Sequence, residues 1–317
     1  MIVLIVLLIL IVLLMTVSHA VYHRSVIATL IELVCSVFKD KSTEEETTAR
    51  LMQKKLEEEP VYVFDRKMKC SVSEERYQNL RVFTLNESNH TPILFYIHGG
   101  AYTGEIGALS WRFLDQIVKK SRCEVRAVVY PLAPWHTWED SYSSITDYYT
   151  QLRKDYPGRG IFLCGDSAGG GLALGIAIHI AQKGLEVPQG LVLISPWVET
   201  TETNPDIPPY EKVDPILASG PLRASAQAWA GDEPLEDWHI SPINGDLGGL
   251  RNVHIFVGTR EMFYPDDVLL YEKLKTLGVT ATLTVGSGMN HCYAAFPIPE
   301  GNKAVRQIAK IIAEGQT

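Results

Sequence analysis

The pentapeptide Gly165-Asp166-Ser167-Ala168-Gly169 is the strongest chemical signal in this sequence. A short apolar run, 161–164, precedes it, and a long run of apolar and small residues, 168–181, follows it. A serine in a sharp turn between a strand and a helix is a nucleophile elbow, whose hydroxyl stands clear of the sheet at a helix N-terminus. This pattern predicts acyl transfer with Ser167 as the nucleophile. The alternative is a glycine-rich turn that happens to contain a serine.

A second glycine-containing loop is expected to form the oxyanion hole. His98-Gly99-Gly100-Ala101-Tyr102 follows the strand-like run 92–97. Two consecutive glycines leave backbone N–H groups that no side chain covers. The amides of Gly99 and Gly100, together with that of Ala168, are predicted to hold the oxygen that becomes negative when a hydroxyl attacks a carbonyl. His98 is expected to hold the loop in place and not to carry a proton.

The predicted general base is His291, one of nine histidines. It lies in the loop 286–291, between the final strand-like alternation, 280–285, and the last helical pattern, 302–313. In enzymes with a nucleophile elbow the triad follows the chain order serine, acid, histidine. The other histidines fall in the N-terminal apolar stretch, in turns and loops, or inside apolar runs, so His291 is the candidate that fits this order.

Two carboxylates compete for the role of triad acid. Glu261 follows the buried-strand pattern 253–257 and falls at the tip of that strand, within reach of a histidine at the same edge. Asp266 comes directly after a proline, and an acid after a proline is what the first turn of a helix prefers. We therefore expect Glu261 to be the acid and retain Asp266 as the alternative.

Together these motifs resemble the hormone-sensitive-lipase-like branch of carboxylesterases in the α/β-hydrolase superfamily. The resemblance extends from about Val61 to the C-terminus and includes the segment Tyr130-Pro131-Leu132-Ala133-Pro134. It implies the same roles for the nucleophile, the base and the three amide donors. Members of this branch usually carry aspartate as the acid, so Glu261 departs from the common pattern. The arrangement with an apolar N-terminus is similar to that of membrane-anchored arylacetamide and sterol deacetylases.

Strand and helix patterns alternate after residue 61, which predicts a mostly parallel sheet with helices on both faces. Residues 61–317 are therefore expected to form one α/β-hydrolase catalytic domain. The long interruption 196–249 is predicted to be a lid above the site, and the helical segment 25–60 to contribute to this cap. Four aromatic residues are candidates for an apolar substrate pocket or, alternatively, for the core of the lid: Trp197, Tyr210, Trp229 and Trp238.

Residues 2–22 are almost wholly apolar and, as a helix, would span about 30 Å. We expect a retained transmembrane signal-anchor in residues 1–24 and hence a single-pass membrane protein. A cleaved signal peptide is the alternative, but no basic region precedes the apolar run. Arg24 favours a cytosolic catalytic domain. Glycosylation sequons at Asn86 and Asn89 favour a luminal one, as in the endoplasmic reticulum.

The composition narrows the range of functions. The net charge of the 317 residues is −8 and basic residues do not cluster, so a nucleic-acid partner has no support. The five cysteines show no metal-ligand spacing, and neither a metal nor a cofactor is expected. The sequence predicts a serine esterase that removes short acyl groups, such as acetyl, from lipophilic alcohols. The alternatives are an amidase or lipase with the same triad, or a non-catalytic binding protein of this fold.

Overall fold

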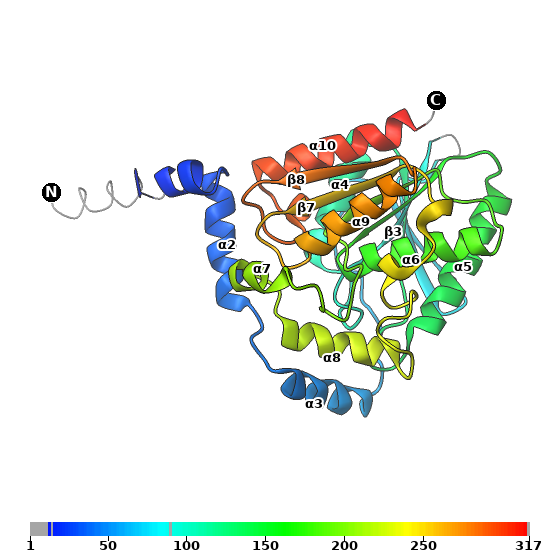
Figure 1. Cartoon of the computed structure of the whole chain (residues 1–317). Helices are drawn as coiled ribbons and strands as arrows, with labels where there is room; N and C mark the ends of the chain where they lie inside the picture. The colour runs from blue at the N-terminus through cyan, green and yellow to red at the C-terminus, as the bar shows by residue number, and fades with distance from the viewer. Residues whose placement is uncertain (1–11, 14, 89–90, 316–317) are drawn as a thin grey trace.

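A mostly parallel sheet lies at the centre of the computed structural model, which describes residues 12–13, 15–88 and 91–315 (Figure 1). Its eight strands have the order β1-β2-β4-β3-β5-β6-β7-β8. Both pairings of β2 are antiparallel, and all the others are parallel. The strands are β1 (Val72–Tyr77), β2 (Leu80–Leu85), β3 (Ile93–Ile97), β4 (Glu124–Val129), β5 (Ile161–Asp166), β6 (Gly190–Ile194), β7 (Val253–Gly258) and β8 (Ala281–Gly286).

Helices cover both faces of this sheet, as the sequence predicts (Figure 1). They are α2 (Val26–Phe38), α3 (Glu44–Lys55), α4 (Ala108–Ser121), α5 (Trp138–Asp155), α6 (Ala168–Gln182), α7 (Ile207–Val213), α8 (Ser219–Ala230), α9 (Tyr264–Thr276) and α10 (Pro299–Glu314). α4 packs against α10 on one face, and α5 packs against α6 on the other. The expected α/β-hydrolase architecture is therefore present.

The position of β3 in the middle of the sheet explains why polar and apolar residues do not alternate in its sequence. Phe95 and Ile97 belong to the buried cluster that α5 and α6 cover, whereas Leu94 and Tyr96 belong to the cluster beneath α4 and α10. Successive side chains of a strand point to opposite faces, and both faces of a parallel sheet are covered. Every residue of β3 is consequently buried and apolar or aromatic.

The insertion between β6 and β7 contains α7 and α8, and the N-terminal segment packs against it. α3 lies beside α8 (Figure 1). The two are so close that a Cβ atom on Gly220 would lie 2.6 Å from the carbonyl oxygen of Ser42. Lys39 Nζ donates a hydrogen bond to the carbonyl oxygen of Asp214 in the insertion, at 2.8 Å. The segment before the sheet and the insertion within it thus form one continuous layer.

Half of the predicted transmembrane helix in residues 1–24, namely residues 1–11 and 14, lies outside the described residues. Its described part contains a π-helical turn, Val17–Val21. Within the part of the chain that the structure describes, no helix is both long and apolar enough to cross a membrane. The anchor therefore stays a prediction.

Candidate active site

The backbone around Ser167 has the form of a nucleophile elbow. Ser167 joins β5 to α6 with φ = 55° and ψ = −126°, a conformation that costs free energy in a residue with a side chain. A Cβ atom on Gly165 would lie 2.1 Å from the carbonyl oxygen of Gly169, and one on Gly169 would lie 2.2 Å from that of Ile97. Only glycine fits at either position, which explains the Gly-x-Ser-x-Gly spacing.

His291 is paired with the carboxylate that the sequence favours. Its Nδ1 lies 2.7 Å from Glu261 Oε2, and both side chains are almost completely buried. The other oxygen, Oε1, accepts hydrogen bonds from the Gly258 N–H at 2.5 Å and from the Ser195 hydroxyl at 2.8 Å. These bonds restrict the orientation of the carboxylate that contacts the imidazole.

Asp266, the alternative acid, points elsewhere. It lies in the first turn of α9, and its Oδ1 accepts a hydrogen bond from Asn204 Nδ2 at 2.6 Å. Burial raises the pKa of the Asp266 carboxyl to about 6. The geometry therefore selects Glu261 as the partner of His291.

The next residue, Asp267, is fully buried close to the same pair. Neither of its carboxyl oxygens has a hydrogen-bond partner among the described residues. Burial, with the nearby charges of Glu261 and Asp266, raises the pKa of Asp267 well above its usual range. Asp267 therefore lies beside the Glu261–His291 pair without contacting the imidazole.

On the other side of the imidazole, Nε2 contacts a thiol that lies next to the end of β6. Nε2 lies 3.3 Å from the Cys292 thiol, and that thiol lies 3.9 Å from the carbonyl oxygen of Ile194. The same carbonyl accepts the N–H of Ser167 at 2.9 Å. Among the described residues the Ser167 hydroxyl has no hydrogen bond to His291, an interaction that in substrate-free enzymes is often long and tightens only with substrate.

Nearby charges and burial shift the pKa of His291 in opposite directions. Burial lowers the pKa of His291, but Glu261, followed by Asp214 and Asp166, outweighs this effect and raises the pKa above its usual value of 6.5. His98 differs, because burial lowers its pKa to about 4 with no carboxylate to oppose it. Its Nδ1 lies 2.7 Å from the Gly99 carbonyl oxygen, and its ring stacks on Tyr130. His98 is therefore a neutral structural residue, in line with the expectation.

The glycine loop lies directly beside Ser167, but its donors differ in part from the prediction. The N–H of Gly99 already donates to Asp166 Oδ1 at 3.1 Å. In the described structure, the amides of Gly100, Ala101 and Ala168 donate to no protein acceptor. The loop is turned by positive φ angles of 122° at Gly100 and 51° at Ala101. The amides free to bind an oxyanion are therefore those of Gly100, Ala101 and Ala168, whereas the predicted donor Gly99 already has a protein acceptor.

Ser195, which no motif in the sequence indicated, bonds both the Glu261 carboxylate and the backbone after His291. It follows β6 directly, has φ = 45° and is fully buried. Its hydroxyl donates to Glu261 Oε1 and accepts the N–H of Cys292 at 2.9 Å, so it connects the acid to the residue after the base. Its only signal in the sequence is a serine that directly follows an apolar strand run at the carboxyl edge.

Two of the four aromatic pocket candidates are core residues. Trp229 stacks on Tyr102 with ring centres 4.4 Å apart, and Tyr102 stacks on Trp197 at 5.5 Å. Trp197 in turn stacks on Phe263 at 5.7 Å, and Phe263 meets the His291 ring edge-on at 5.3 Å. This column of rings joins α8 to His291. The other two candidates, Tyr210 and Trp238, pack against Tyr264 and His239.

A groove of about 320 Å³ opens beside the glycine loop. One wall is Ala101 and Thr103 of that loop, and the other walls come from the N-terminal segment and the insertion. The remaining lining residues are Asp40, Thr47, Arg50, Leu51, Ile216, Leu217, Ala218, Pro221, Leu222 and Ser225. The groove therefore begins next to Ala101, one of the residues whose amide is free.

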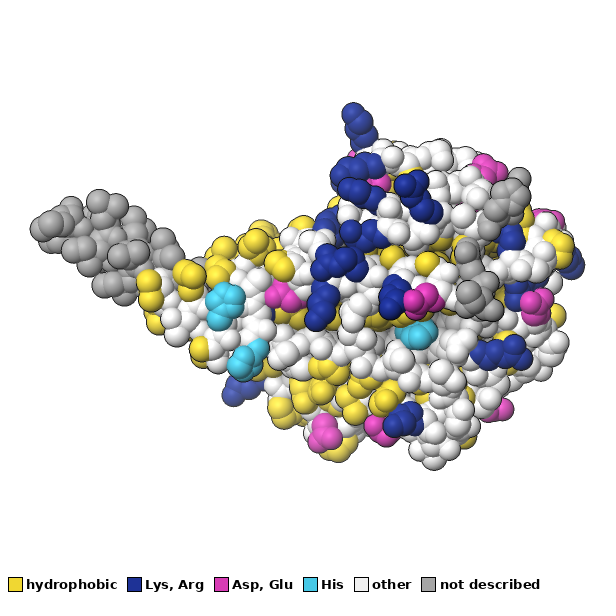
Figure 2. Space-filling view, turned by 90° about the horizontal axis from the view of Figure 1, so that it is seen from above, with side chains coloured by type: hydrophobic (Ala, Val, Ile, Leu, Met, Phe, Trp, Pro, Cys, Tyr) yellow, Lys and Arg dark blue, Asp and Glu magenta, His cyan; other side chains and the backbone are white. Residues whose placement is uncertain are grey.

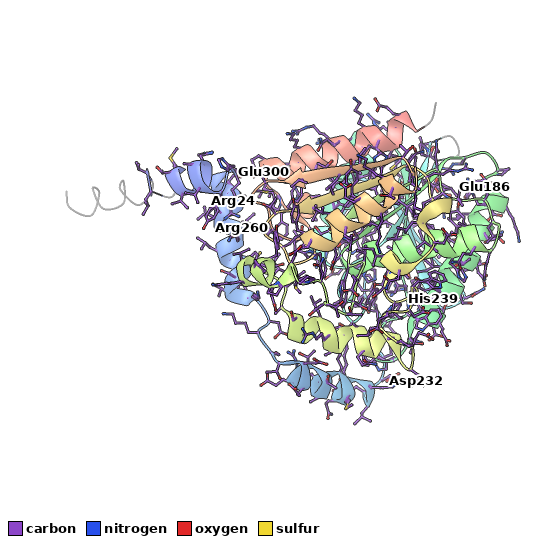
Figure 3. All side chains as sticks on the ribbon, viewed as in Figure 1. Arg24, Glu186, Asp232, His239, Arg260 and Glu300 are labelled. Carbon is purple, nitrogen blue, oxygen red and sulfur yellow. The ribbon has the colours of Figure 1, made fainter. Side chains whose placement is uncertain are left out.

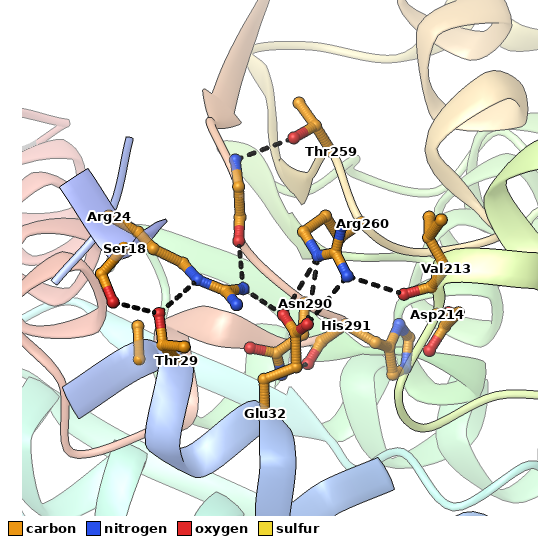
Figure 4. Close-up of polar contacts among 12 residues, drawn as sticks. Ser18, Arg24, Thr29, Glu32, Val213, Asp214, Thr259, Arg260, Asn290 and His291 are labelled. Atoms are coloured by element: carbon orange, nitrogen blue, oxygen red, sulfur yellow. Dashed lines mark hydrogen bonds and ion pairs between the residues drawn. The ribbon is translucent and has the colours of Figure 1, made fainter. Parts of the chain in front are cut away.

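An ion-pair cluster lies behind both catalytic loops (Figure 4). Arg260, which precedes Glu261, donates to Glu32 of α2, the shortest contact being 2.8 Å. Arg24 also pairs with Glu32, and it donates to the carbonyl oxygen of Gly288 in the histidine loop at 2.7 Å. Figure 3 shows Arg24, Arg260 and Glu300 gathered at the start of α2. The N-terminal segment therefore contacts the loops that carry the acid and the base.

Comparison with known proteins agrees with this geometry. Residues 94–295 match a family described as alpha/beta hydrolase fold. This chain belongs to that family. Esterase LipU of Mycobacterium tuberculosis is 32% identical over 239 residues, which cover 70% of this chain and 77% of the relative. An acetyl-hydrolase of Streptomyces hygroscopicus is 29% identical over 219 residues, covering 67% and 72%. The crystal structure of the hormone-sensitive-lipase homologue EstE7 from a metagenome library covers 92% of this chain and 99% of its own, with a TM-score of 0.77 and 22% identity.

Proposed function

We propose that this protein is a serine carboxylesterase that removes short acyl groups, acetyl above all, from esters of lipophilic alcohols. The observation that carries the proposal is the buried Glu261–His291 pair beside a strained serine elbow and three uncommitted backbone amides. Membership in the alpha/beta hydrolase family and the named esterase relatives support an enzyme that acts on carboxylic ester bonds.

The mechanism follows from these positions. The Ser167 hydroxyl attacks the ester carbonyl while His291 Nε2 accepts its proton, and the amides of Gly100, Ala101 and Ala168 stabilise the oxyanion. Glu261 keeps the proton on Nδ1 and stabilises the imidazolium, which then protonates the departing alcohol. Water attacks the acyl-enzyme with the same base, and the carboxylic acid leaves.

The preference for short acyl groups rests on the aromatic column and on a relative. Phe263 and Trp197 are fully packed beside the base and leave little room for a long chain there. The Streptomyces relative is an acetyl-hydrolase. We expect turnover of p-nitrophenyl esters to fall steeply from acetate to decanoate. A profile that rises with chain length would contradict the acyl preference but not the ester chemistry.

Replacement of the nucleophile tests the ester chemistry itself. We expect Ser167→Ala to abolish hydrolysis of p-nitrophenyl acetate and covalent labelling by a fluorophosphonate. A matched control is Ser141→Ala, because Ser141 is also buried but lies elsewhere, where its hydroxyl donates to the Pro131 carbonyl oxygen. Retained turnover in the Ser167 variant would exclude the proposed nucleophile, and absence of labelling in the unchanged protein would favour a non-catalytic binding role.

The proposed location is a membrane, with the apolar residues 2–22 as a single-pass anchor and the catalytic domain in the lumen of the endoplasmic reticulum. The apolar sequence of this segment and the two sequons support it. At Asn86 the side-chain amide donates to the carbonyl oxygens of Arg122 and Cys123, at 3.0 and 3.1 Å, so Asn89 is the better acceptor for a glycan. Sensitivity to endoglycosidase, lost in Asn89→Gln, would support the luminal side. Protease digestion of intact microsomes that removes the domain would contradict it.

A further inference from the structure

The polar and apolar side chains of helix α2 (Val26–Phe38) are distributed in the opposite way to those of an ordinary surface helix. The side that faces the protein includes the polar residues Thr29 and Glu32, whereas large apolar side chains point outward. The outward residues, 47% to 81% exposed, are Ile27, Leu30, Leu33, Val34, Val37 and Phe38. Surface helices of globular proteins normally turn their apolar stripe toward the core and their charges toward water. Because exposure of these apolar side chains to water is unfavourable, we expect an apolar environment on the outer side of α2.

Buried polar contacts fix the orientation of α2. Glu32 accepts from both Arg24 and Arg260, and the Thr29 hydroxyl accepts from Arg24 Nε at 3.0 Å and from Ser18 at 2.9 Å. A rotation that turned the apolar stripe inward would expose these partners and leave charges unpaired beneath the helix. Such unpaired buried charges are strongly destabilising. The outward apolar face is therefore a fixed property of the folded protein.

The apolar surface continues toward the N-terminus of the described chain. Val12, Leu13 and Val21 are all more than half exposed, and the sequence of residues 2–11 consists only of isoleucine, valine and leucine. Figure 2 shows apolar side chains gathered along the N-terminal segment where it meets the globular body. No lysine or arginine lies within α2 itself.

The size of the face distinguishes a lipid surface from a protein partner. Thirteen helical residues extend about 20 Å, and a stripe about 10 Å wide covers roughly 200 Å². A stable protein interface buries about 800 Å² on each partner, so α2 alone is far too small to hold a second copy or another protein. A bilayer requires no shape complementarity and binds helices with an outward apolar stripe at the boundary between headgroups and acyl chains.

We propose that α2 lies in the surface of a lipid bilayer, with its outward apolar face among the acyl chains and its polar face on the catalytic domain. This contact is distinct from an anchor in residues 2–22, because it fixes how the domain is oriented on the membrane. α2 ends at Phe38, and Asp40, two residues later, lines the groove beside Ala101. The contact places the groove near the bilayer, from which lipophilic esters would enter. This last consequence rests on the proposed function, whereas the bilayer contact does not.

Fluorescence quenching by lipids tests the contact directly. A nitrobenzoxadiazole label is attached at Leu30→Cys or, as the reference, at Leu56→Cys, which lies after α3 and is 82% exposed. In both proteins the partly exposed Cys35 and Cys70 are replaced by serine. With phosphatidylcholine vesicles that contain brominated acyl chains, we expect quenching of about half or more at position 30 and little at position 56. Absence of quenching at position 30, or equal quenching at both, would overturn the proposal.

The same label distinguishes a bilayer from a second copy of the protein, or another segment of the chain, as the cover of the apolar face of α2. Emission typical of apolar surroundings before vesicles are added would show that the face is already covered, and would also overturn the proposal. If that emission increases with protein concentration, a second copy is the occupant. If it is independent of concentration, other residues of the same chain cover the helix.

A matched pair of double variants tests whether the apolar side chains themselves hold the helix in the lipid. Val34→Ser with Val37→Ser weakens the proposed face, whereas Val61→Ser with Val63→Ser removes two valines of similar exposure outside it. We expect quenching at position 30 to fall about threefold or more in the first variant and to persist in the second. Unchanged circular dichroism spectra and unfolding midpoints show that both variants fold. Equal quenching in the two variants would refute the role of the face, and this result does not depend on ester hydrolysis.

Discussion

The Ser195 hydroxyl donates a hydrogen bond to Glu261 Oε1 at 2.8 Å and simultaneously accepts the N–H of Cys292 at 2.9 Å. One buried side chain thus connects the acid loop to the histidine loop. Because Ser195 does not reach the groove, we regard it as a positioning residue that acts on the base through Glu261.

Ser195→Ala should lower both activity and stability. The variant leaves the Cys292 N–H without its acceptor and removes one donor from Glu261, a loss of about 1–3 kcal/mol in the free energy of unfolding. We expect kcat to fall about tenfold with KM nearly unchanged, which corresponds to about 1.4 kcal/mol of barrier. Ser141→Ala is the control, since it removes an equally buried hydroxyl away from the triad. A variant that loses stability but retains kcat would leave Ser195 with a structural role alone.

The acid assignment is tested by replacing each carboxylate with its amide. Glu261→Gln keeps the shape but removes the charge that stabilises the His291 imidazolium, so kcat should fall on the order of 10³–10⁴-fold. Asp266→Asn should leave kcat close to that of the unchanged enzyme, because Asp266 bonds Asn204 and not the base. Steady-state rates of p-nitrophenyl acetate hydrolysis measure both. A larger loss in the Asp266 variant would reverse the assignment.

The pH dependence of acylation follows from the raised pKa of His291. The base must be neutral to accept a proton, so kcat/KM should fall as the pH drops through that pKa. Since Glu261, Asp214 and Asp166 together outweigh burial, the midpoint should lie above the usual histidine value of 6.5.

Asp214→Asn removes one of the charges that raise this pKa, so its midpoint should move to lower pH. Asp147→Asn makes the same charge change at an exposed position on α5 and should leave the midpoint in place. A profile of kcat/KM against pH for the three proteins provides the measurement. A midpoint below the usual histidine value in the unchanged enzyme would contradict the electrostatic account.

Local sequence patterns were sufficient to predict the parallel strands, the elbow and the residues Ser167, His291 and Glu261 as neighbours at one edge of the sheet. The strands follow from periodicity and the elbow from a steric requirement for glycine at positions 165 and 169, whereas His291 and Glu261 follow from the chain order of the triad after such an elbow. Strand β1 was missed, because its sequence, Val-Ser-Glu-Glu-Arg-Tyr, is that of an exposed edge strand without an apolar run. Its pairing with β2 is determined by the rest of the sheet.

Contacts between distant segments account for the features of the site that the sequence did not indicate. The sequence of the glycine loop does not reveal that Asp166, from another segment, accepts the N–H of Gly99, whereas the N–H of Ala101 stays free. The partner of Ser195 is likewise 66 residues away. Arg24, which the sequence suggested as a charge flanking a membrane segment, is only 3% exposed and is paired with Glu32.

The steric argument for the elbow predicts a large difference between two glycine substitutions. In Gly169→Ala the new Cβ would lie 2.2 Å from the Ile97 carbonyl oxygen, so we expect destabilisation by about 3 kcal/mol or more. In Gly107→Ala, at the N-terminus of α4, no atom lies within 4 Å of the new Cβ. That variant should change the free energy of unfolding by no more than about 1 kcal/mol. Urea denaturation compares the two, and equal stabilities would contradict the close approach of the backbones.

The cluster around Glu32 predicts that the N-terminal segment supports catalysis from outside the site. Glu32→Gln leaves the buried guanidinium of Arg24 and the neighbouring Arg260 without their carboxylate, which should cost about 3–5 kcal/mol of unfolding free energy. Arg260 and Gly288 belong to the acid and histidine loops, so loss of this support should also lower kcat while KM changes little.

The matched control is Glu314→Gln, which makes the same substitution in an exposed pair with Lys310 near the end of α10. An exposed ion pair contributes at most about 1 kcal/mol, so both stability and kcat should be nearly unchanged there. Rates measured at a temperature well below the unfolding midpoint separate a positioning effect from simple loss of folded enzyme. If Glu32→Gln retains full kcat under those conditions, the cluster stabilises the fold without positioning His291.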